Sequence, residues 1–477
     1  MTTERATFSA IAANRFGFGA RPGELAQADS DPHSQLLSQV RTPYRVSDEL
    51  AGLATGAQIL AAFLAAREAR AEQKKALARD ATADENTVQA LVTGVREQLL
   101  PHYIAQASAR TRIALHSEAS FRERLVHFWS NHFAVSVDKP ICLGTAGALE
   151  NEAIRPRIDG HFSDLLLAVE THPAMITFLD NQRSAGPHSE LGVRAARHAS
   201  GPSTGKIGLN ENLAREILEL HTLGVNGGYT QSDVTAFAAV LTGWSIGGGQ
   251  GRYRGGEPGA FLFREALHEP GSHDLLGRHY AEAGMAQGEA VLRHLAAHPA
   301  TARHLALKLA RHFVADDPPP TLVDRLARAY RDSDGHLPTV YEALIRSDEA
   351  WSKEPQKFKQ PCEFVYSALR ALAVTPDQPK ALLGPFEVLG QRHWSPGSPA
   401  GWPDRQADWM GADALMQRIE WSVALADRMG ESHSALETLG AGLGPLATPH
   451  THQALETAAS GSQALVLFLM SPEFQRR

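Results

Sequence analysis

The feature that most constrains this chain is residues 209–244, LNENLAREILELHTLGVNGGYTQSDVTAFAAVLTGW, which predict two helices joined by a tight turn. On a helical wheel, the apolar residues of the first half share one broad arc, and polar side chains lie opposite. Asn210 suits an N-cap, Gly224 suits the end of the first helix, and Thr230 suits the cap of the second. The stretch therefore predicts helix packing against helix as the basis of the fold.

The polar side of the first helix has two interpretations. In the first, Glu211, Arg215 and Glu219 form ion pairs on a solvated face, each worth roughly a few tenths of a kcal/mol. In the second, Asn212, Glu216 and Glu219 line an internal site, while Glu211 and Arg215 stay closer to the surface. Glu216 lies at the edge of the apolar arc, where partial burial raises a carboxyl pKa and suits it to act as a general base.

A second helix with a dense polar stripe is predicted within residues 109–136, ARTRIALHSEASFRERLVHFWSNHFAVS. Glu123, His127 and Asn131 recur at i, i+4 and i+8, opposite an arc of apolar and aromatic residues. His132 falls in the apolar arc if the helix continues. It is therefore either a core histidine or a residue that turns into a cleft where the helix ends.

The chain as a whole predicts a mostly α protein, a multi-helix orthogonal bundle with one small β-hairpin near residues 261–282 and long irregular loops. We expect an N-terminal helical region at 1–105, a central helical core at 106–350 and a C-terminal helical region at 351–477. The last region contains a Trp/Pro/Gly-rich loop at 390–410. The alternative is one continuous globular body.

Composition excludes several classes of protein. Hydrophobic residues make up 43% and charged residues 21% of the 477 residues, as is usual for a folded chain. The net charge of -7 is spread over mixed acidic and basic residues, so no nucleic-acid partner is expected. We find no apolar stretch of ~18 residues and expect no membrane span. The start of the chain has no recognisable secretion signal, which predicts a cytoplasmic location.

Familiar local signatures of enzymes are absent from the sequence. It contains no GxSxG elbow, no HExxH zinc helix, no P-loop, no GxGxxG after a strand and no CxxC. Polar residues are instead spread over several predicted helices, and 22 histidines are a mild excess. This distribution is typical of a site built from inward-facing side chains of different helices.

Six segments of the chain resemble, in order, the signature segments of the bacterial domain-of-unknown-function family 1800. They are RERLVHFWSNHFAVS, LENEAIRP, HPAMITFLDN, the stretch at 209–244, HPATARHLALKLARHFV and PAGWP. The resemblance implies no catalytic role, because the family has no established activity. The polar, aromatic and proline residues that match the signatures are His127, Trp129, Asn131, His132, Glu150, Asn151, Glu152, Asp180, Asn181, Asn210, Glu211, Asn212, Arg215, Glu216, Glu219, His221, Lys308, Arg311, Trp402 and Pro403.

The resemblance also suggests a partner and an alternative location. Members of the family often carry export signals, and they are commonly encoded beside a second uncharacterised family, number 1501. Proteins of that second family look like alkaline-phosphatase-type or sulfatase-type proteins. A family 1501 protein is therefore the implied partner of this chain, and export together with it to the periplasm is the alternative to a cytoplasmic location.

The first hypothesis for function is a metal-assisted enzyme, hydrolytic or oxidative, with a divalent ion as cofactor. The predicted metal ligands are His127, His132, Asp180, Glu216 and Glu219. The predicted catalytic residues are Glu216, Arg215 and His127, and the predicted substrate-binding residues are Asn131, Asn181, Asn212 and Trp402.

Two alternatives need no catalysis. In one, the chain is a scaffold or binding partner whose carboxylates and arginines form a structural network. In the other, Trp394, Trp402 and Trp409 are stacking platforms for a polysaccharide or a peptide.

Overall fold

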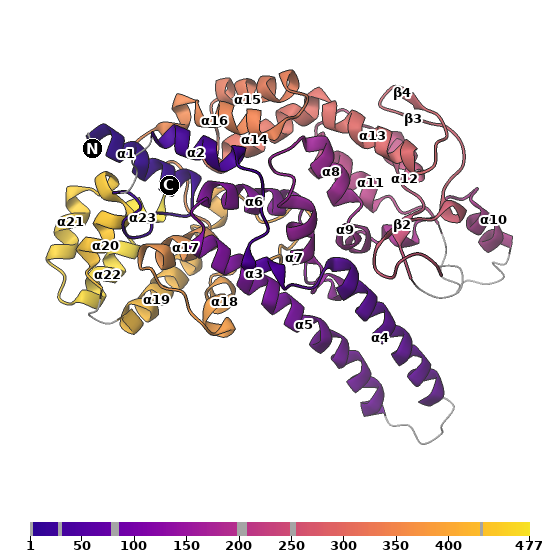
Figure 1. Cartoon of the computed structure of the whole chain (residues 1–477), viewed down its shortest axis with the longest axis horizontal. Coiled ribbons are helices and arrows are strands. Elements are labelled where there is room, and N and C mark those ends of the chain that lie inside the picture. Colours follow the sequence, from indigo (N-terminus) through magenta and orange to yellow (C-terminus); the bar gives the residue numbers. More distant parts are fainter. Residues whose placement is uncertain (1–2, 27–30, 78–84, 198–207, 249–253, 430–432) are drawn as a thin grey trace.

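The structure, a computed structural model, describes residues 3–26, 31–77, 85–197, 208–248, 254–429 and 433–477. The chain is mostly α-helical, as the sequence predicts, and its helices cross at varied angles rather than in one parallel bundle (Figure 1). The N-terminal elements are α1 (Thr3–Ile11), η1 (Ala12–Phe16), α2 (Pro32–Arg41), α3 (Asp48–Ala51), α4 (Gly56–Leu77) and α5 (Glu85–His116). Helices α4 and α5 form an antiparallel pair that projects from the body, and the C-terminal part of α5 reaches its centre (Figure 1).

The central part of the chain carries most of the signature segments. Its helices are α6 (Ser120–His132), η2 (Pro140–Cys142), α7 (Ala146–Leu149), η3 (Glu150–Ile154), α8 (Phe162–Glu170), α9 (Pro173–Phe178), η4 (Asn181–Arg183), α10 (Glu190–Arg197), α11 (Asn212–Glu216), η5 (Ile217–His221), α12 (Gln231–Val240), η7 (Glu265–Leu267), α13 (Met285–Ala297), α14 (Pro299–Phe313), α15 (Pro320–Asp332), α16 (Leu337–Ile345) and η8 (Asp348–Trp351).

The C-terminal part forms a second group of helices at one end of the molecule (Figure 1). They are α17 (Pro361–Ala371), α18 (Pro379–Val388), η9 (Gln406–Asp408), α19 (Ala412–Met429), α20 (Ala435–Gly442), η11 (Gly444–Leu446), α21 (Pro449–Glu456), α22 (Gly461–Leu469) and α23 (Pro472–Gln475).

The helix at residues 210–223 is less regular than its wheel predicts. After α11 the backbone changes to the π-helical η5, whose wider turn shifts every later side chain around the axis. Of the predicted caps, Thr230 is confirmed as the N-cap of α12, whereas the N-cap of α11 is Glu211 and Asn210 lies one residue before it. The Asn210 side chain accepts from the Asn212 backbone N–H, Gly224 has a φ of 84°, and Thr230 forms a capping box with Asp233.

The described strands form two small antiparallel pairs. Strand β1 (Trp244–Ile246) pairs with β2 (Phe261–Phe263), and β3 (His273–Leu275) pairs with β4 (Arg278–Tyr280). The second pair is the hairpin predicted near residues 261–282. Its two turn residues, Leu276 and Gly277, have φ of 50° and 71°, the positive values that a type I′ turn requires.

Two large apolar clusters form the core. The larger one takes buried side chains from residues 11–394, so it joins the predicted N-terminal and central regions. At its heart, the ring of Phe121 lies 5.4 Å from that of Phe16 and 5.6 Å from that of Phe313. The second cluster combines Phe18 and the end of α5 with residues 364–474. The boundary between these two clusters is where the site described below is built.

One segment of the described chain, Asp48–Glu72, is long and apolar enough to cross a membrane by length and composition alone. The sequence by itself predicts no membrane span, here or elsewhere. About 28% of its most apolar window is buried within the protein. The helical structure is interrupted between α3 and α4, and the segment ends with Arg67, Glu68 and Arg70, so this finding is weak evidence for a span.

Candidate active site

A cleft with a volume of about 310 Å³ opens between α6, α14, the start of α17 and the loop at 390–410. It combines aromatic walls with a strongly basic lining. The polar and aromatic residues that line it are Phe18, Arg110, Arg124, His127, Phe128, Ser130, Asn131, His132, Lys308, Arg311, His312, Gln360, Cys362, Glu363, Gln391, Arg392, His393, Trp394, Trp402, Asp404, Arg405 and Asp408. Of the site residues predicted from the sequence, the cleft contains His127, Asn131, His132, Trp394 and Trp402.

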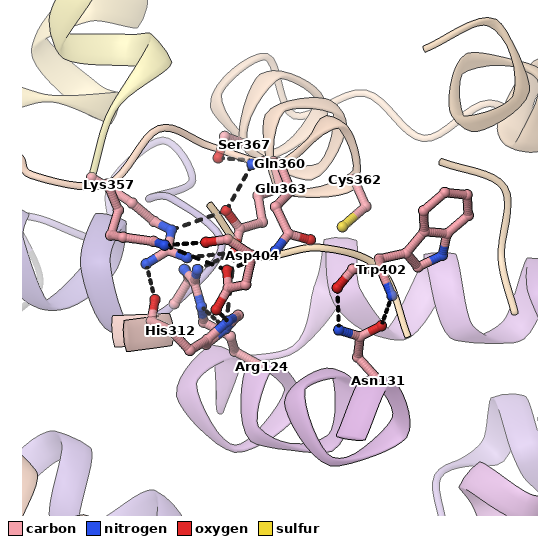
Figure 2. A network of polar contacts seen from close by, with 12 residues as sticks. Arg124, Asn131, His312, Lys357, Gln360, Cys362, Glu363, Ser367, Trp402 and Asp404 are labelled. Atoms are coloured by element: carbon pink, nitrogen blue, oxygen red, sulfur yellow. Dashed lines mark hydrogen bonds and ion pairs between the residues drawn. The ribbon is translucent and has the colours of Figure 1, made fainter. Parts of the chain in front are cut away.

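Asn131 fixes the tryptophan-rich loop to the end of α6. Its side-chain N–H donates to the Trp402 carbonyl at 2.9 Å, and its side-chain oxygen accepts from the Trp402 backbone N–H at 2.7 Å (Figure 2). Gly401 has a φ of 84°, and a Cβ there would lie 2.3 Å from the Asn131 carbonyl oxygen, so only glycine fits. Both polar ends of the Asn131 amide are therefore used to shape the cleft, which is a positioning role.

We predict that Asn131→Ala loosens this wall of the cleft while the fold remains intact. Loss of both amide hydrogen bonds removes about 1–3 kcal/mol of local stability, so the Trp402 backbone N–H is expected to exchange with deuterium roughly 10–100 times faster. Hydrogen exchange followed by mass spectrometry measures this. Ser130→Ala, a neighbouring cleft residue with no described bond to that amide, is the control. Unchanged exchange at Trp402 in Asn131→Ala would contradict the assignment.

His132 has both ring nitrogens engaged. Its Nε2 lies 3.1 Å from the His221 carbonyl oxygen, which only accepts, so Nε2 carries the hydrogen. Its Nδ1 lies 2.9 Å from the Lys308 ammonium and accepts from it. Burial, with Lys308 nearby, holds the pKa of His132 well below its ordinary value. His132 is thus a neutral histidine that faces the cleft and orients Lys308.

His127 is held among aromatic rings. Its ring lies 5.0 Å from that of Phe18 and 5.6 Å from that of Tyr366. Its Nε2 is 3.4 Å from a Glu123 carboxylate oxygen, and that buried nitrogen has no hydrogen-bond partner within the described structure. Burial and the Arg110 charge lower the pKa of His127 to about 4, so its imidazole is neutral at pH 7.

A buried network around Glu363 forms one wall of the cleft (Figure 2). Glu363 is the third residue of α17, and its carboxylate accepts from the Gln360 backbone N–H in a capping box. The same carboxylate receives two hydrogen bonds of 2.9 Å from Arg477 and another from Arg124. Burial acts to raise the pKa of Glu363, but the two guanidinium groups outweigh it and bring the pKa to about 2.

Asp404 is the second anion of this wall. It accepts from His312 Nδ1 at 3.2 Å and from the Gln360 side-chain amide at 2.8 Å (Figure 2). Since Arg124 donates to His312 Nε2 at 3.3 Å, the hydrogen of the neutral His312 ring lies on Nδ1. Burial opposes ionisation of Asp404, but His312 and Lys357 hold the pKa of Asp404 well below its ordinary range. The negative charges of Glu363 and Asp404 in this wall are therefore balanced by buried basic side chains of the protein itself.

A second buried network lies under the opposite wall. Arg110 donates to Glu150 at 2.8 and 3.1 Å and faces His393 Nδ1 at 3.0 Å. Arg155 bridges Glu150 at 3.3 Å and Glu123 at 2.8 Å. Charged side chains of the signature segments thus form buried ion pairs that join one helix to another, which is the arrangement that the scaffold hypothesis describes.

Two cations of the cleft lining, Lys308 and Arg311, have no carboxylate within ion-pair distance in the described part of the chain. Lys308 donates to His132 instead, and Arg311 Nε donates at 3.0 Å to the backbone oxygen of Asp316. By contrast, Arg392 and Arg405 each form an ion pair of 3.0 Å, with Asp138 and Asp317 respectively. Lys308 and Arg311 lie three residues apart on α14 and are therefore neighbours on one face of that helix.

The remaining predicted residues lie outside this cleft. Asp180 has a φ of 58° and pairs with Lys139 at 2.7 Å. Asn181 is buried and donates to the backbone oxygens of Leu241 and Trp244 at 3.0 and 2.9 Å, so it holds a chain turn. The structure therefore does not bring Asp180 and Asn181 together with the histidines of α6.

The polar side of the helix that opened the sequence analysis also faces elsewhere. Asn212 is exposed, and Arg215 pairs with Glu211 at 2.9 Å on the surface. Glu216 is half-buried, and burial raises its pKa as the wheel suggests. Glu219 is half-buried and accepts from the Tyr229 hydroxyl at 3.4 Å. None of these side chains lines the cleft.

For a metal, the described residues offer no group of three or more His, Cys, Asp or Glu side chains arranged to hold one. The predicted ligands are dispersed, and both nitrogens of His132 are already engaged. The divalent ion remains a prediction from the sequence.

Comparison with known proteins agrees with the resemblance seen in the sequence. A family model described as "Protein of unknown function (DUF1800)" matches residues 11–476. No curated protein and no solved structure matches the chain.

Proposed function

The chain belongs to the DUF1800 family of proteins of unknown function, and on this premise we propose that its cleft binds a small organic anion. The observation that carries the proposal is the pair Lys308 and Arg311, two neighbouring cations that face the cleft without a carboxylate partner among the described residues. Like charges at this spacing on a helix repel each other. A bound carboxylate or phosphate supplies the missing counter-charge and accepts charge-assisted hydrogen bonds from both side chains.

The rest of the lining supports an organic ligand rather than a bare ion. Phe18, Phe128, Trp394 and Trp402 provide apolar and aromatic walls. A volume of about 310 Å³ suits a molecule of the size of a substituted aromatic or short-chain acid. Since the other cleft arginines are neutralised by carboxylates of the protein, they hold the walls rigid and leave the anion to Lys308 and Arg311.

We predict that benzoate and phenyl phosphate bind the protein and that Arg311→Met weakens their binding roughly 10–100-fold. Removal of one charge-assisted hydrogen-bond donor costs about 1.5–3 kcal/mol, which gives this factor. Isothermal titration calorimetry measures it. Arg303→Met is the matched control, because Arg303 lies on the same helix but is exposed and pairs with Asp324 at 2.6 Å. Benzyl alcohol is the uncharged comparison ligand. Equal binding of benzyl alcohol and benzoate, or equal affinity in Arg311→Met, would contradict the proposal.

A further inference from the structure

We propose that Lys308 is a nucleophilic amine that forms an imine with the carbonyl group of an aldehydic or 2-oxo acid held in the cleft. This inference rests on the proposed anion binding and extends it to a substrate class and a reacting group. Lys308 lines the cleft, and its described hydrogen bond goes to the neutral His132 ring. Arg311, one helical turn further along α14, is placed to bind the acid group of the same ligand.

The surroundings of Lys308 differ from those of lysines that serve as structural cations. Lys357 contacts the Asp316 carboxylate at 2.5 Å, and Lys139 contacts that of Asp180 at 2.7 Å, so each of them is held in an ion pair. The nearest partner of Lys308 is instead a ring nitrogen that only accepts a hydrogen bond. This contact fixes the direction of the amine without adding a negative charge. His132 is accordingly a positioning residue.

The side chains that face Lys308 leave its amine without an ion pair. They are His132 from α6, His304 and Arg311 from α14 and Asp404 from the loop at 390–410. The Asp404 carboxylate contacts His312, Gln360 and Lys357 instead, and among the described residues it forms no ion pair with Lys308. No carboxylate of the described structure therefore competes with a carbonyl compound for the Lys308 amine.

The reaction needs no oxidant or further reagent. The Nζ lone pair forms the new C–N bond while the carbonyl π electrons move to oxygen, which gives a carbinolamine. The two hydrogens lost from nitrogen end on that oxygen, which leaves as water, so amine and carbonyl become imine and water. Lys308 touches the reacting carbon and is the catalytic residue of this step, while Arg311 binds the ligand.

Reductive trapping tests the inference on the full chain. The protein is incubated with glyoxylate and cyanoborohydride, whose hydride converts an imine to a stable secondary amine, and each lysine is followed by peptide mass spectrometry. We expect Lys308 to gain the carboxymethyl group at least about tenfold faster than the exposed Lys380, because Arg311 holds the acid group of glyoxylate beside it. Lys359 is an internal control. Its pKa is lowered to about 7, but it is buried and does not line the cleft, so it should stay unlabelled.

Two variants separate this inference from the proposed function. Arg311→Met should slow labelling by glyoxylate but not by the uncharged propionaldehyde. Lys308→Arg should lose the label at this position, and its circular dichroism spectrum and urea-unfolding midpoint check that the fold is intact. If benzoate binds and Lys308 reacts no faster than Lys380, the imine is excluded and anion binding stands. If Lys308 reacts equally with both carbonyl compounds and benzoate does not bind, the proposed anion site is excluded.

Discussion

Glu363→Gln is expected to lower the free energy of unfolding by about 3–5 kcal/mol at pH 7, because it leaves two buried guanidinium groups without their shared anion. Arg124 and Arg477 are each almost fully buried, and both donate to this carboxylate. Urea unfolding followed by circular dichroism measures the loss. The pKa of Glu363 in the folded protein, about 2, is below its value in the unfolded chain, near 4.5. Its contribution is therefore complete above about pH 4.5 and is lost as the pH falls towards 2.

The natural protein and Glu363→Gln should accordingly differ less in their free energy of unfolding as the pH is lowered from about 4.5 towards 2. Glu190→Gln is the control, because Glu190 forms an exposed i,i+4 pair with Arg194 at 3.0 Å. That substitution should change stability by less than about 1 kcal/mol. If Glu363→Gln lowers the free energy of unfolding by the same amount at pH 7 and at pH 3, the charge of the Glu363 carboxylate is not what stabilises the wall.

Glu150→Met is the second substitution with a large expected cost, about 3–5 kcal/mol in the free energy of unfolding. Glu150 is fully buried, and it accepts from Arg110 at 2.8 Å and from the Trp394 indole N–H at 3.1 Å. Its removal leaves the Arg110 guanidinium without a carboxylate, whereas Arg155 keeps its bonds to Glu123. Denaturant unfolding of the purified variant gives the cost.

The double variant Glu150→Met/Arg110→Met distinguishes a lost charge pair from lost packing. Once both charges are removed, no unpaired ion remains in the interior, so the double variant should be more stable than the sum of the two single losses predicts. Strict additivity of the two losses would contradict a direct charge pair.

Local patterns in the sequence predicted local structure well. Thr230 and Asp233 form the capping box that their spacing indicates, and the hairpin lies where alternation and glycine predict it. His127 and Asn131, placed on one stripe of a predicted helix, do reach the same cleft as Trp402. The capping box, the hairpin and the stripe on α6 depend on neighbours within a few residues, and the sequence carries that information directly.

The rest of the site depends on contacts that leave no local pattern. Arg124 and Glu363 are 239 residues apart, so no periodicity connects them. The π turn at η5 displaces Glu219 from the position that a regular wheel gives it, because its backbone turn is wider than the α-helical one. Gln360 and Glu363 had a usable signal, the capping box around Pro361, but it indicates only where a helix begins.

The most direct test of the anion site is a crystal of the protein soaked in 4-bromobenzoate, with the bromine located by anomalous scattering. We expect a bromine peak between the aromatic walls of the cleft, with the carboxylate in hydrogen-bond contact with Lys308 Nζ and the Arg311 guanidinium. We also expect Arg311→Met crystals to lose the peak and Arg303→Met crystals to keep it. A bound ligand whose carboxylate points away from both cations, or a cleft that stays empty at saturating ligand, would contradict the account.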